Sequence, residues 1–593
     1  MKQFFKFMFA SFAGTLLTLL LILFLVIGMI SSLVSMAEKE DVSIKPHTVL
    51  VINFDKPILD RAPNNPLEGF DFSAFKANQP LGMDDILKNI EKAATDPNID
   101  GIYLDLSEIS AGGANLVEIR TKLNAFKASG KFIISYSEAY SQSSYYLASL
   151  SNEIYLNPKG MLMFKGLNAQ IVFLKNMLDK LEIEPQIIRG PNNKFKSAVE
   201  PLMLDKMSEA NREQMEKLLN STWGKLIEGI SESRNISIDE LNRIADELEL
   251  SNANKALEYK FVDGLKYKDE ILALLREKTG LGEKDKIESV SLTKYTNVKV
   301  EKDTKSRVKD KIAIIYAIGS IGGGDGSESS IGSEGLSKAI RKAREDEKVK
   351  AIVMRVNSPG GSALASEIIR REVELAKTAK PFIVSMGNVA ASGGYWISTN
   401  ADYIFADPTT ITGSIGVFGV IPNMKGLFNN KLGITFDKAM TNKNADFIDV
   451  MEPMSEFQHM KIQQEVVAIY DDFTSLVART RNLRQSYVDS IGQGRVWTGA
   501  DAIGIGLVDK LGGLEDAIAY AAEKAGLGDN YKITTLPEQK DPFQQLIDEM
   551  TGQSRVSVLK KELGSYYSYV EYLQQMEQMK GVQARLPFHF TIN

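Results

Sequence analysis

The chain has 593 residues with no cysteine, three histidines (His47, His459 and His589) and a formal net charge of −6. These counts exclude a disulfide scaffold, a thiolate zinc site, an iron–sulfur cluster and a cysteine nucleophile, and the charge argues against nucleic acid as a partner. Three scattered histidines leave little material for a metal site or a Ser-His-Asp triad, so we expect no metal and no cofactor, and hydrolytic chemistry would need a different base.

The first predicted element is a membrane-spanning helix. No charged residue occurs from Phe7 to Ala37. This run is longer than the stretch of about 20 apolar residues that crosses a bilayer, and longer than the apolar core of a secretory signal peptide. Lys2 and Lys6 precede the run, so the positive-inside rule places the N-terminus in the cytoplasm and the rest of the chain across the membrane. We therefore expect residues 1–40 to form an uncleaved signal anchor.

The remainder of the chain contains an internal duplication. A shift of about 250 positions gives an ungapped match over about 80 residues, in which, for example, Phe132-Ile133 meets Phe382-Ile383. We expect two units, residues 45–290 and 310–535, with a linker near 285–310. A tail, residues 536–593, follows them, and the sequence assigns it no role.

Each unit is predicted to alternate short strands and helices. Residues 84–95 and 335–345 have the apolar spacing of helices. The apolar runs that predict buried strands lie at 49–52, 102–104 and 132–134 in the first unit and at 312–315, 352–354 and 382–384 in the second. This alternation predicts an α/β fold with largely parallel pairing.

The two units differ at positions that could carry chemistry. In register, Gln142 of the first unit lies opposite Ser392 of the second, and Phe164 lies opposite Ser414. Glutamine and phenylalanine cannot attack a carbonyl, so a nucleophile survives only in the second unit. Further along, after a one-residue shift, Lys196 of the first unit lies opposite Phe447, so the basic residue survives only in the first unit.

The motifs resemble those of the signal peptide peptidase A (protease IV) family in its long, tandem-repeat form. The resemblance covers nearly the whole chain except the tail. The stretches that carry it are residues 195–201 (FKSAVEP), 357–361 (NSPGG), 391–399 (ASGGYWIST), 412–417 (TGSIGV) and 494–499 (GRVWTG).

This resemblance implies tandem crotonase- and Clp-protease-like domains and a Ser/Lys dyad. It implies that Ser392 is the nucleophile, that Lys196 is the general base and that the hydroxyl of Ser414 orients the lysine amine. It also implies an envelope enzyme of the bacterial inner membrane, a ring-like homotetramer, which acts on cleaved signal peptides and other apolar peptides. The two catalytic residues would come from different units, either of one chain or of neighbouring chains.

General chemistry supports such a dyad. A free lysine has a pKa of about 10.4, and burial in apolar surroundings lowers this pKa, so a buried amine can take the proton of a serine. Glycines let backbone amides approach a developing oxyanion, and Gly361 and Gly393 are the predicted donors. Two alternative functions remain: a broader envelope quality-control protease, and a non-catalytic membrane scaffold that only binds ligands.

Overall fold

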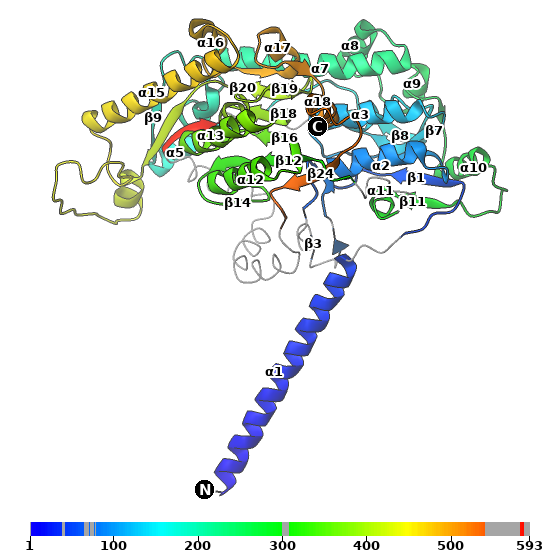
Figure 1. The fold of residues 1–593 in the computed structure, drawn as a ribbon, viewed down its shortest axis with the longest axis horizontal. Helices are drawn as coiled ribbons and strands as arrows, with labels where there is room; N and C mark the ends of the chain where they lie inside the picture. Colours follow the sequence, from blue (N-terminus) through cyan, green and yellow to red (C-terminus); the bar gives the residue numbers. More distant parts are fainter. Residues whose placement is uncertain are drawn as a thin grey trace.

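The computed structural model describes residues 2–37, 42–63, 70–71, 76–77, 79–298, 308–539 and 581–585. Two α/β units lie side by side, and helix α1 (Lys2–Ala37) projects away from both (Figure 1). Residues Gln3–Ile22 of this helix are long and apolar enough to cross a membrane, and none of this stretch is buried against the rest of the protein.

The first unit contains a six-stranded parallel sheet of order β10-β8-β7-β6-β1-β11. Its apolar side chains pack into one large core with α2, α3 and α4. The bounds of these elements are β1 Thr48–Ile52, α2 Met83–Thr95, β6 Ile99–Asp105, α3 Gly113–Lys127, β7 Phe132–Tyr140, α4 Gln142–Ala148, β8 Glu153–Leu162, β10 Gly264–Leu265 and β11 Ser289–Ser291.

The second unit repeats this plan in an eight-stranded sheet. The path β22-β20-β18-β16-β12-β24 is parallel except for β22, while β19 pairs with β18 and β23 pairs with β19. The bounds are β12 Lys311–Ile318, α12 Ser333–Glu345, β16 Val349–Ser358, α13 Ala363–Ala379, β18 Phe382–Ala391, α14 Gly393–Ser398, β19 Tyr403–Ala406, β20 Ile411–Gly413, β22 Val496–Thr498, β23 Lys510–Leu511 and β24 Lys532–Leu536. All six predicted strands, both predicted helices and the predicted α/β duplication are confirmed.

The remaining helices cover the outer faces of the two sheets or connect them. They are α5 Lys175–Leu181, α6 Glu200–Met203, α7 Glu209–Arg234, α8 Ile238–Asp246, α9 Ala253–Glu258, α10 Lys268–Lys278, α11 Leu292–Tyr295, α15 Glu456–Thr480, α16 Gln485–Ile491, α17 Gly499–Gly504 and α18 Leu514–Lys524. Two short pairs of strands lie before α2, namely β2 (Ile58–Leu59) with β5 (Leu81–Gly82) and β3 (Phe70–Asp71) with β4 (Lys76–Ala77).

The segment predicted to be a linker, residues 285–310, is partly structured. Strand β11 pairs with β1 in parallel and α11 follows it directly, so this part of the prediction is wrong. In the second unit β24 pairs with β12 in the same way. Each unit thus ends with a strand at the edge of its sheet. The first of these strands was not predicted because the charged composition of residues 285–310 indicated a linker.

A third sheet joins distant parts of the chain. Its order is β14-β15-β13-β17-β25-β21-β9. Strand β9 comes from the first unit and β25 from the C-terminal tail, whereas the other five strands belong to the second unit. The bounds are β9 Glu184–Arg189, β13 Ser320–Gly322, β14 Gly326–Ser327, β15 Ser330–Gly332, β17 Gly360–Ser362, β21 Phe418–Asn423 and β25 Gly581–Arg585. Because β9 pairs antiparallel with β21 over its whole length, the chain that follows β9 is delivered to the second unit.

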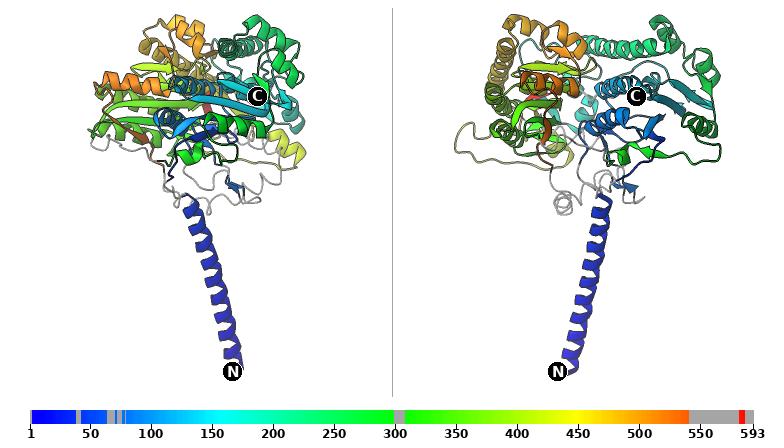
Figure 2. Two further views of the ribbon diagram at one scale, coloured as in Figure 1. Left: turned by 90° about the vertical axis from the view of Figure 1, so that its right-hand side faces the viewer. Right: turned by 45° about the vertical axis from the view of Figure 1, so that its right-hand side comes forward.

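Polar contacts also fix the two units against each other. Arg355 of β16 is buried, and its guanidinium donates hydrogen bonds to Asp60 (2.7 Å) and Glu118 (2.6 Å) of the first unit. Helix α7 runs across the top of the molecule towards the second unit (Figure 2), where the Ser221 Oγ lies 2.9 Å from the Thr498 Oγ1. The relative position of the units is therefore defined by specific buried contacts.

Candidate active site

Ser392 lies between the end of β18 and the start of α14, at the centre of the second unit. Its side chain is fully buried and its backbone has φ +57° and ψ −116°. A positive φ is unfavourable for a residue with a side chain, and such strain concentrates at functional sites. The backbone N–H of Ser392 donates to the Gly413 carbonyl at 2.8 Å, and this bond ties the strained turn to β20.

Lys196 reaches this serine from the first unit of the same chain. Its side chain is fully buried, and its Nζ lies 2.8 Å from the Ser392 Oγ. Burial lowers the pKa of Lys196 well below its ordinary value of 10.5. No carboxylate lies within ion-pairing distance of this amine among the described residues, so the neutral form is favoured there. The structure thus joins the two residues within one chain.

Ser414 completes a cluster of three polar side chains. The Lys196 Nζ lies 2.9 Å from the Ser414 Oγ and 3.0 Å from the Ser414 carbonyl oxygen. Ser414 also has a positive φ, +52°, and its N–H donates to the Arg495 carbonyl at 2.7 Å. The three predicted side chains therefore meet at one buried point.

The lysine is held by close backbone packing around Gly494. A methyl group on Gly494 would lie 2.4 Å from the Lys196 Cβ, and Gly494 has a φ of +78°. The Phe195 N–H donates to the Gln493 carbonyl at 2.9 Å, and the amide of Gln214 on α7 donates to the Phe195 carbonyl at 3.0 Å. We did not predict a role for Gln214, because the residues around it on α7 do not indicate a contact with Phe195.

The first unit has filled the equivalent position. The Gln142 Oε1 accepts hydrogen bonds from the backbone N–H groups of Lys165 (2.7 Å) and Gly166 (2.8 Å). Phe164 is buried against the rings of Trp223 and Phe261. These two side chains are therefore part of the packed interior of the first unit.

The predicted oxyanion glycines lie in different surroundings. Gly393 directly follows Ser392 and begins α14, where the first N–H groups have no acceptor within the helix. Gly361 lies in β17, one residue beyond Gly360, and pairs with Ile321 of β13. Gly360, which we did not predict, lies against the residue that follows Ser392, since a methyl group on it would lie 2.6 Å from the Gly393 nitrogen. Its φ of +92° requires glycine there.

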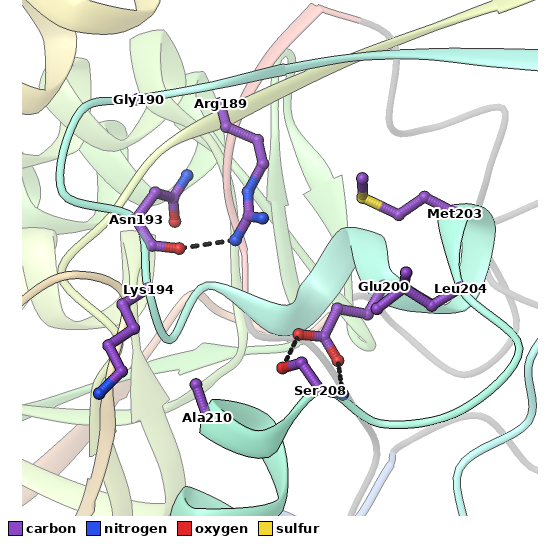
Figure 3. Close-up of a pocket in the computed structure, with 9 residues that line it drawn as sticks. All are labelled: Arg189, Gly190, Asn193, Lys194, Glu200, Met203, Leu204, Ser208 and Ala210. Carbon is purple, nitrogen blue, oxygen red and sulfur yellow. Dashed lines mark hydrogen bonds between the residues drawn. The ribbon is translucent and has the colours of Figure 1, made fainter.

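A pocket of about 490 Å³ is lined by residues that come before and after Lys196 in the chain (Figure 3). Arg189 and Asn193 lie on one side of it, and the Arg189 guanidinium donates to the Asn193 carbonyl at 2.6 Å. On the other side the Glu200 carboxylate accepts hydrogen bonds from the hydroxyl (2.5 Å) and the N–H (3.2 Å) of Ser208. These contacts fix the segment that follows Lys196. Within the described part of the chain, no group of three or more His, Asp and Glu side chains could hold a metal ion.

A family model and several similar proteins point to one family. Residues 125–282 and 374–528, one segment in each unit, match peptidase family S49. "Protease 4" of Salmonella typhi is 38% identical over 487 residues, which cover 80% of this chain and 77% of that protein. "Serine protease SPPA, chloroplastic" of Arabidopsis thaliana is 35% identical over 480 residues, covering 80% of this chain and 70% of that protein.

A shorter relative and a solved structure match parts of the chain. "Putative signal peptide peptidase SppA" of Enterococcus faecium is 39% identical over 194 residues, which cover 32% of this chain and 55% of that protein. The structure of ClpP1 from Listeria monocytogenes is similar over 34% of this chain and 92% of its own, with 15% identity and a TM-score of 0.22.

Proposed function

The chain belongs to peptidase family S49 and is a serine peptidase, and from this premise we propose that Ser392 and Lys196 form its catalytic dyad and that it degrades cleaved signal peptides at a membrane. One observation carries the dyad: a fully buried lysine amine lies 2.8 Å from a buried serine hydroxyl. Because the chain is a peptidase, the non-catalytic scaffold is rejected as an alternative.

In the proposed mechanism the neutral Lys196 amine takes the proton of the Ser392 hydroxyl as the Oγ attacks the scissile carbonyl. The resulting ammonium then donates this proton to the leaving amine as the C–N bond breaks. A water molecule, deprotonated by the same amine, hydrolyses the ester and regenerates the serine. Ser414 holds the amine towards Ser392 through the 2.9 Å contact with its hydroxyl.

The negative charge of the tetrahedral intermediate requires hydrogen-bond donors beside Ser392. We assign the backbone N–H of Gly393 to this role, because it lies next to the nucleophile in sequence and heads α14. Gly361 remains the second predicted donor, and its place in β17 lies beside that of Gly360, whose α-carbon faces the Gly393 nitrogen. Both donors are backbone groups, so their positions depend on the backbone of α14 and β17 rather than on side-chain rotamers.

Peptide hydrolysis should depend on pH through Lys196. The amine acts as a base only when it is neutral, and its pKa lies well below 10.5 because the side chain is buried. We therefore expect kcat/KM to rise with pH and to reach its plateau well below pH 10.5. A pH–rate profile with a fluorogenic peptide checks this, and a rise centred at the pKa of a solvated lysine would contradict a buried base.

The membrane anchor and the substrate are linked in this proposal. Helix α1 is long and apolar enough to hold the protein at a bilayer, where the apolar segments left by signal peptide processing also remain. We place the protein in the bacterial inner membrane, and Lys2 and Lys6 ahead of the apolar run favour a cytoplasmic N-terminus with the catalytic units outside the cytoplasm. The dyad is complete in one chain, so the proposed homotetramer would restrict access to the sites rather than complete them.

The substrate is tested with the full chain reconstituted in lipid vesicles. A synthetic signal peptide inserted in the same vesicles should disappear with the wild-type protein and persist with the Ser392→Ala variant. A water-soluble polar peptide of equal length serves as the comparison. Hydrolysis of both peptides at equal rates would instead favour the broader envelope quality-control protease.

A further inference from the structure

Gln214 of α7 contacts the chain on both sides of Lys196. Its side chain is buried, and its Nε2 donates hydrogen bonds to the Phe195 carbonyl oxygen (3.0 Å) and to the Ser197 Oγ (2.8 Å). The Phe195 carbonyl belongs to the planar peptide group that contains the Lys196 nitrogen, so the first bond fixes the plane from which the lysine side chain starts. The second bond holds the residue that follows the lysine.

A buried carboxylate determines which end of the Gln214 amide faces this segment. Glu200 accepts hydrogen bonds from the Ser208 hydroxyl (2.5 Å), as Figure 3 shows, and from the Asn211 Nδ2 (2.9 Å). Because the Asn211 Nδ2 is directed at Glu200, the Asn211 Oδ1 faces the Gln214 Nε2 at 3.2 Å. An oxygen in place of this nitrogen would lie against two other acceptors. The amide therefore donates towards the lysine segment in one orientation only.

Helix α7 also reaches the part of the site that carries the nucleophile. The Gln214 Oε1 accepts a hydrogen bond from the Val496 N–H of β22 at 3.4 Å. Leu218, one turn further along the helix, belongs to one apolar cluster with Ala391 and Val496. Ala391 directly precedes Ser392 in the chain. One face of a helix from the first unit thus contacts the neighbours of both dyad residues.

We propose that Gln214 is a positioning residue for peptide hydrolysis, whose amide fixes the backbone around Lys196 and so keeps the lysine amine in contact with the Ser392 hydroxyl. This inference rests on the proposed dyad. Among the described residues, the Lys196 Nζ donates to Ser392 and Ser414, so Gln214 acts through the backbone and not on the reacting atoms. A displacement of about 1 Å between reacting groups costs about 10²-fold in rate.

Replacement of Gln214 by methionine tests this role in the full chain. Methionine has a similar length and removes both hydrogen bonds, so kcat for a fluorogenic peptide should fall about 10- to 100-fold with KM within a factor of two. A lysine without a fixed position is more solvated and its pKa is higher, so the midpoint of the pH–rate profile should rise by about one unit. An unchanged kcat, or a lower kcat with the wild-type midpoint, would overturn the proposal.

A buried glutamine on another helix gives the matched control. Gln458 of α15 is buried, and its Oε1 accepts a hydrogen bond from the Ser455 N–H at 2.8 Å. Gln458→Met removes buried hydrogen bonds at the start of α15, so it should lower the stability but leave kcat and the midpoint of the pH–rate profile at their wild-type values. A shift of the midpoint equal to that of Gln214→Met would show that any lost buried amide has this effect, against the proposal.

The Lys196→Met background shows whether Gln214 acts through the lysine. In this background Gln214→Met should lower kcat by less than a factor of about two, because there is no amine left to position. An equal fall in both backgrounds would overturn the proposal. If circular dichroism shows that Gln214→Met is unfolded, Ser197→Ala removes only one of the two hydrogen bonds and should lower kcat about threefold. A wild-type kcat for Ser197→Ala would then count against the role of Gln214.

The two proposals fail in different ways. If Ser392→Ala abolishes hydrolysis of the fluorogenic peptide but Gln214→Met has the wild-type kcat, the dyad stands and only the role of Gln214 is wrong. If Ser392→Ala hydrolyses the peptide at the wild-type rate, the dyad itself is wrong.

Discussion

Replacement of Lys196 by methionine is expected to lower kcat for peptide hydrolysis by about 10²- to 10⁴-fold, the contribution of a general base. Methionine is an unbranched, uncharged side chain, so it can occupy the fully buried site without adding a charge. The Ser392 hydroxyl then has no amine to accept its proton. The measurement is kcat with a fluorogenic peptide, accompanied by circular dichroism to show that the fold is retained.

A matched control lies two residues away. Lys194 is exposed, and its Nζ lies 4.8 Å from the centre of the Phe195 ring. Lys194→Met makes the same substitution in the same segment, outside the buried cluster, and should change kcat less than twofold. In the proposed dyad Ser392 and Lys196 act as a unit, so the Ser392→Ala/Lys196→Met double variant should be no slower than the slower single variant. A Lys196→Met protein that kept more than a tenth of the wild-type kcat would exclude Lys196 as the base.

Loss of the cation between the two units should have the largest effect on stability. Burial by itself would lower the pKa of Arg355, but the charges of Glu118 and Asp60 hold this pKa above its ordinary value. Arg355→Met would leave two buried carboxylates without their cation, which costs about 3–5 kcal/mol in the free energy of unfolding. Urea unfolding followed by the fluorescence of the three tryptophans checks this value.

Two further variants separate the buried cluster from a general charge effect. The Arg371 side chain is 61% exposed and its guanidinium lies 2.7 Å from Glu374, so Arg371→Met should cost less than about 1 kcal/mol. Adding Asp60→Asn and Glu118→Gln to Arg355→Met removes the uncompensated charges and should recover most of the lost stability. If the triple variant is no more stable than Arg355→Met, lost packing rather than charge explains the effect.

The duplication could be predicted because both units show the same local pattern of apolar residues. Runs such as 132–134 and 382–384 consist of residues that favour buried strands, and the spacing in 84–95 favours a helix whatever its surroundings. The absence of serines from the matched positions of the first unit is visible in the same comparison. Gln142 and Phe164 stand at the matched positions, and in the structure they fill the place that Ser392 and Ser414 occupy in the second unit.

Contacts between distant segments could not be predicted in this way. Strand β11 lies in a charged stretch whose composition is typical of a linker. It forms a strand because it can pair with the free edge of β1. Gly360 has no room for a side chain because its α-carbon faces the Gly393 nitrogen, a contact that depends on how β17 packs against α14. Neither residue type nor spacing carries such information.

The sequence by itself determined the two α/β units and the apolar N-terminal helix, since each depends on a local pattern or on a comparison of positions within the chain. The family resemblance of its motifs pointed to the serine and the lysine of the proposed dyad. The tertiary structure alone decided that Lys196 and Ser392 meet within one chain, 2.8 Å apart. Pairing of β9 with β21 delivers the lysine, and burial lowers its pKa. Long-range strand pairing also decided where the tail lies, because a strand of five residues has no preferred partner until a sheet with an open position is assembled.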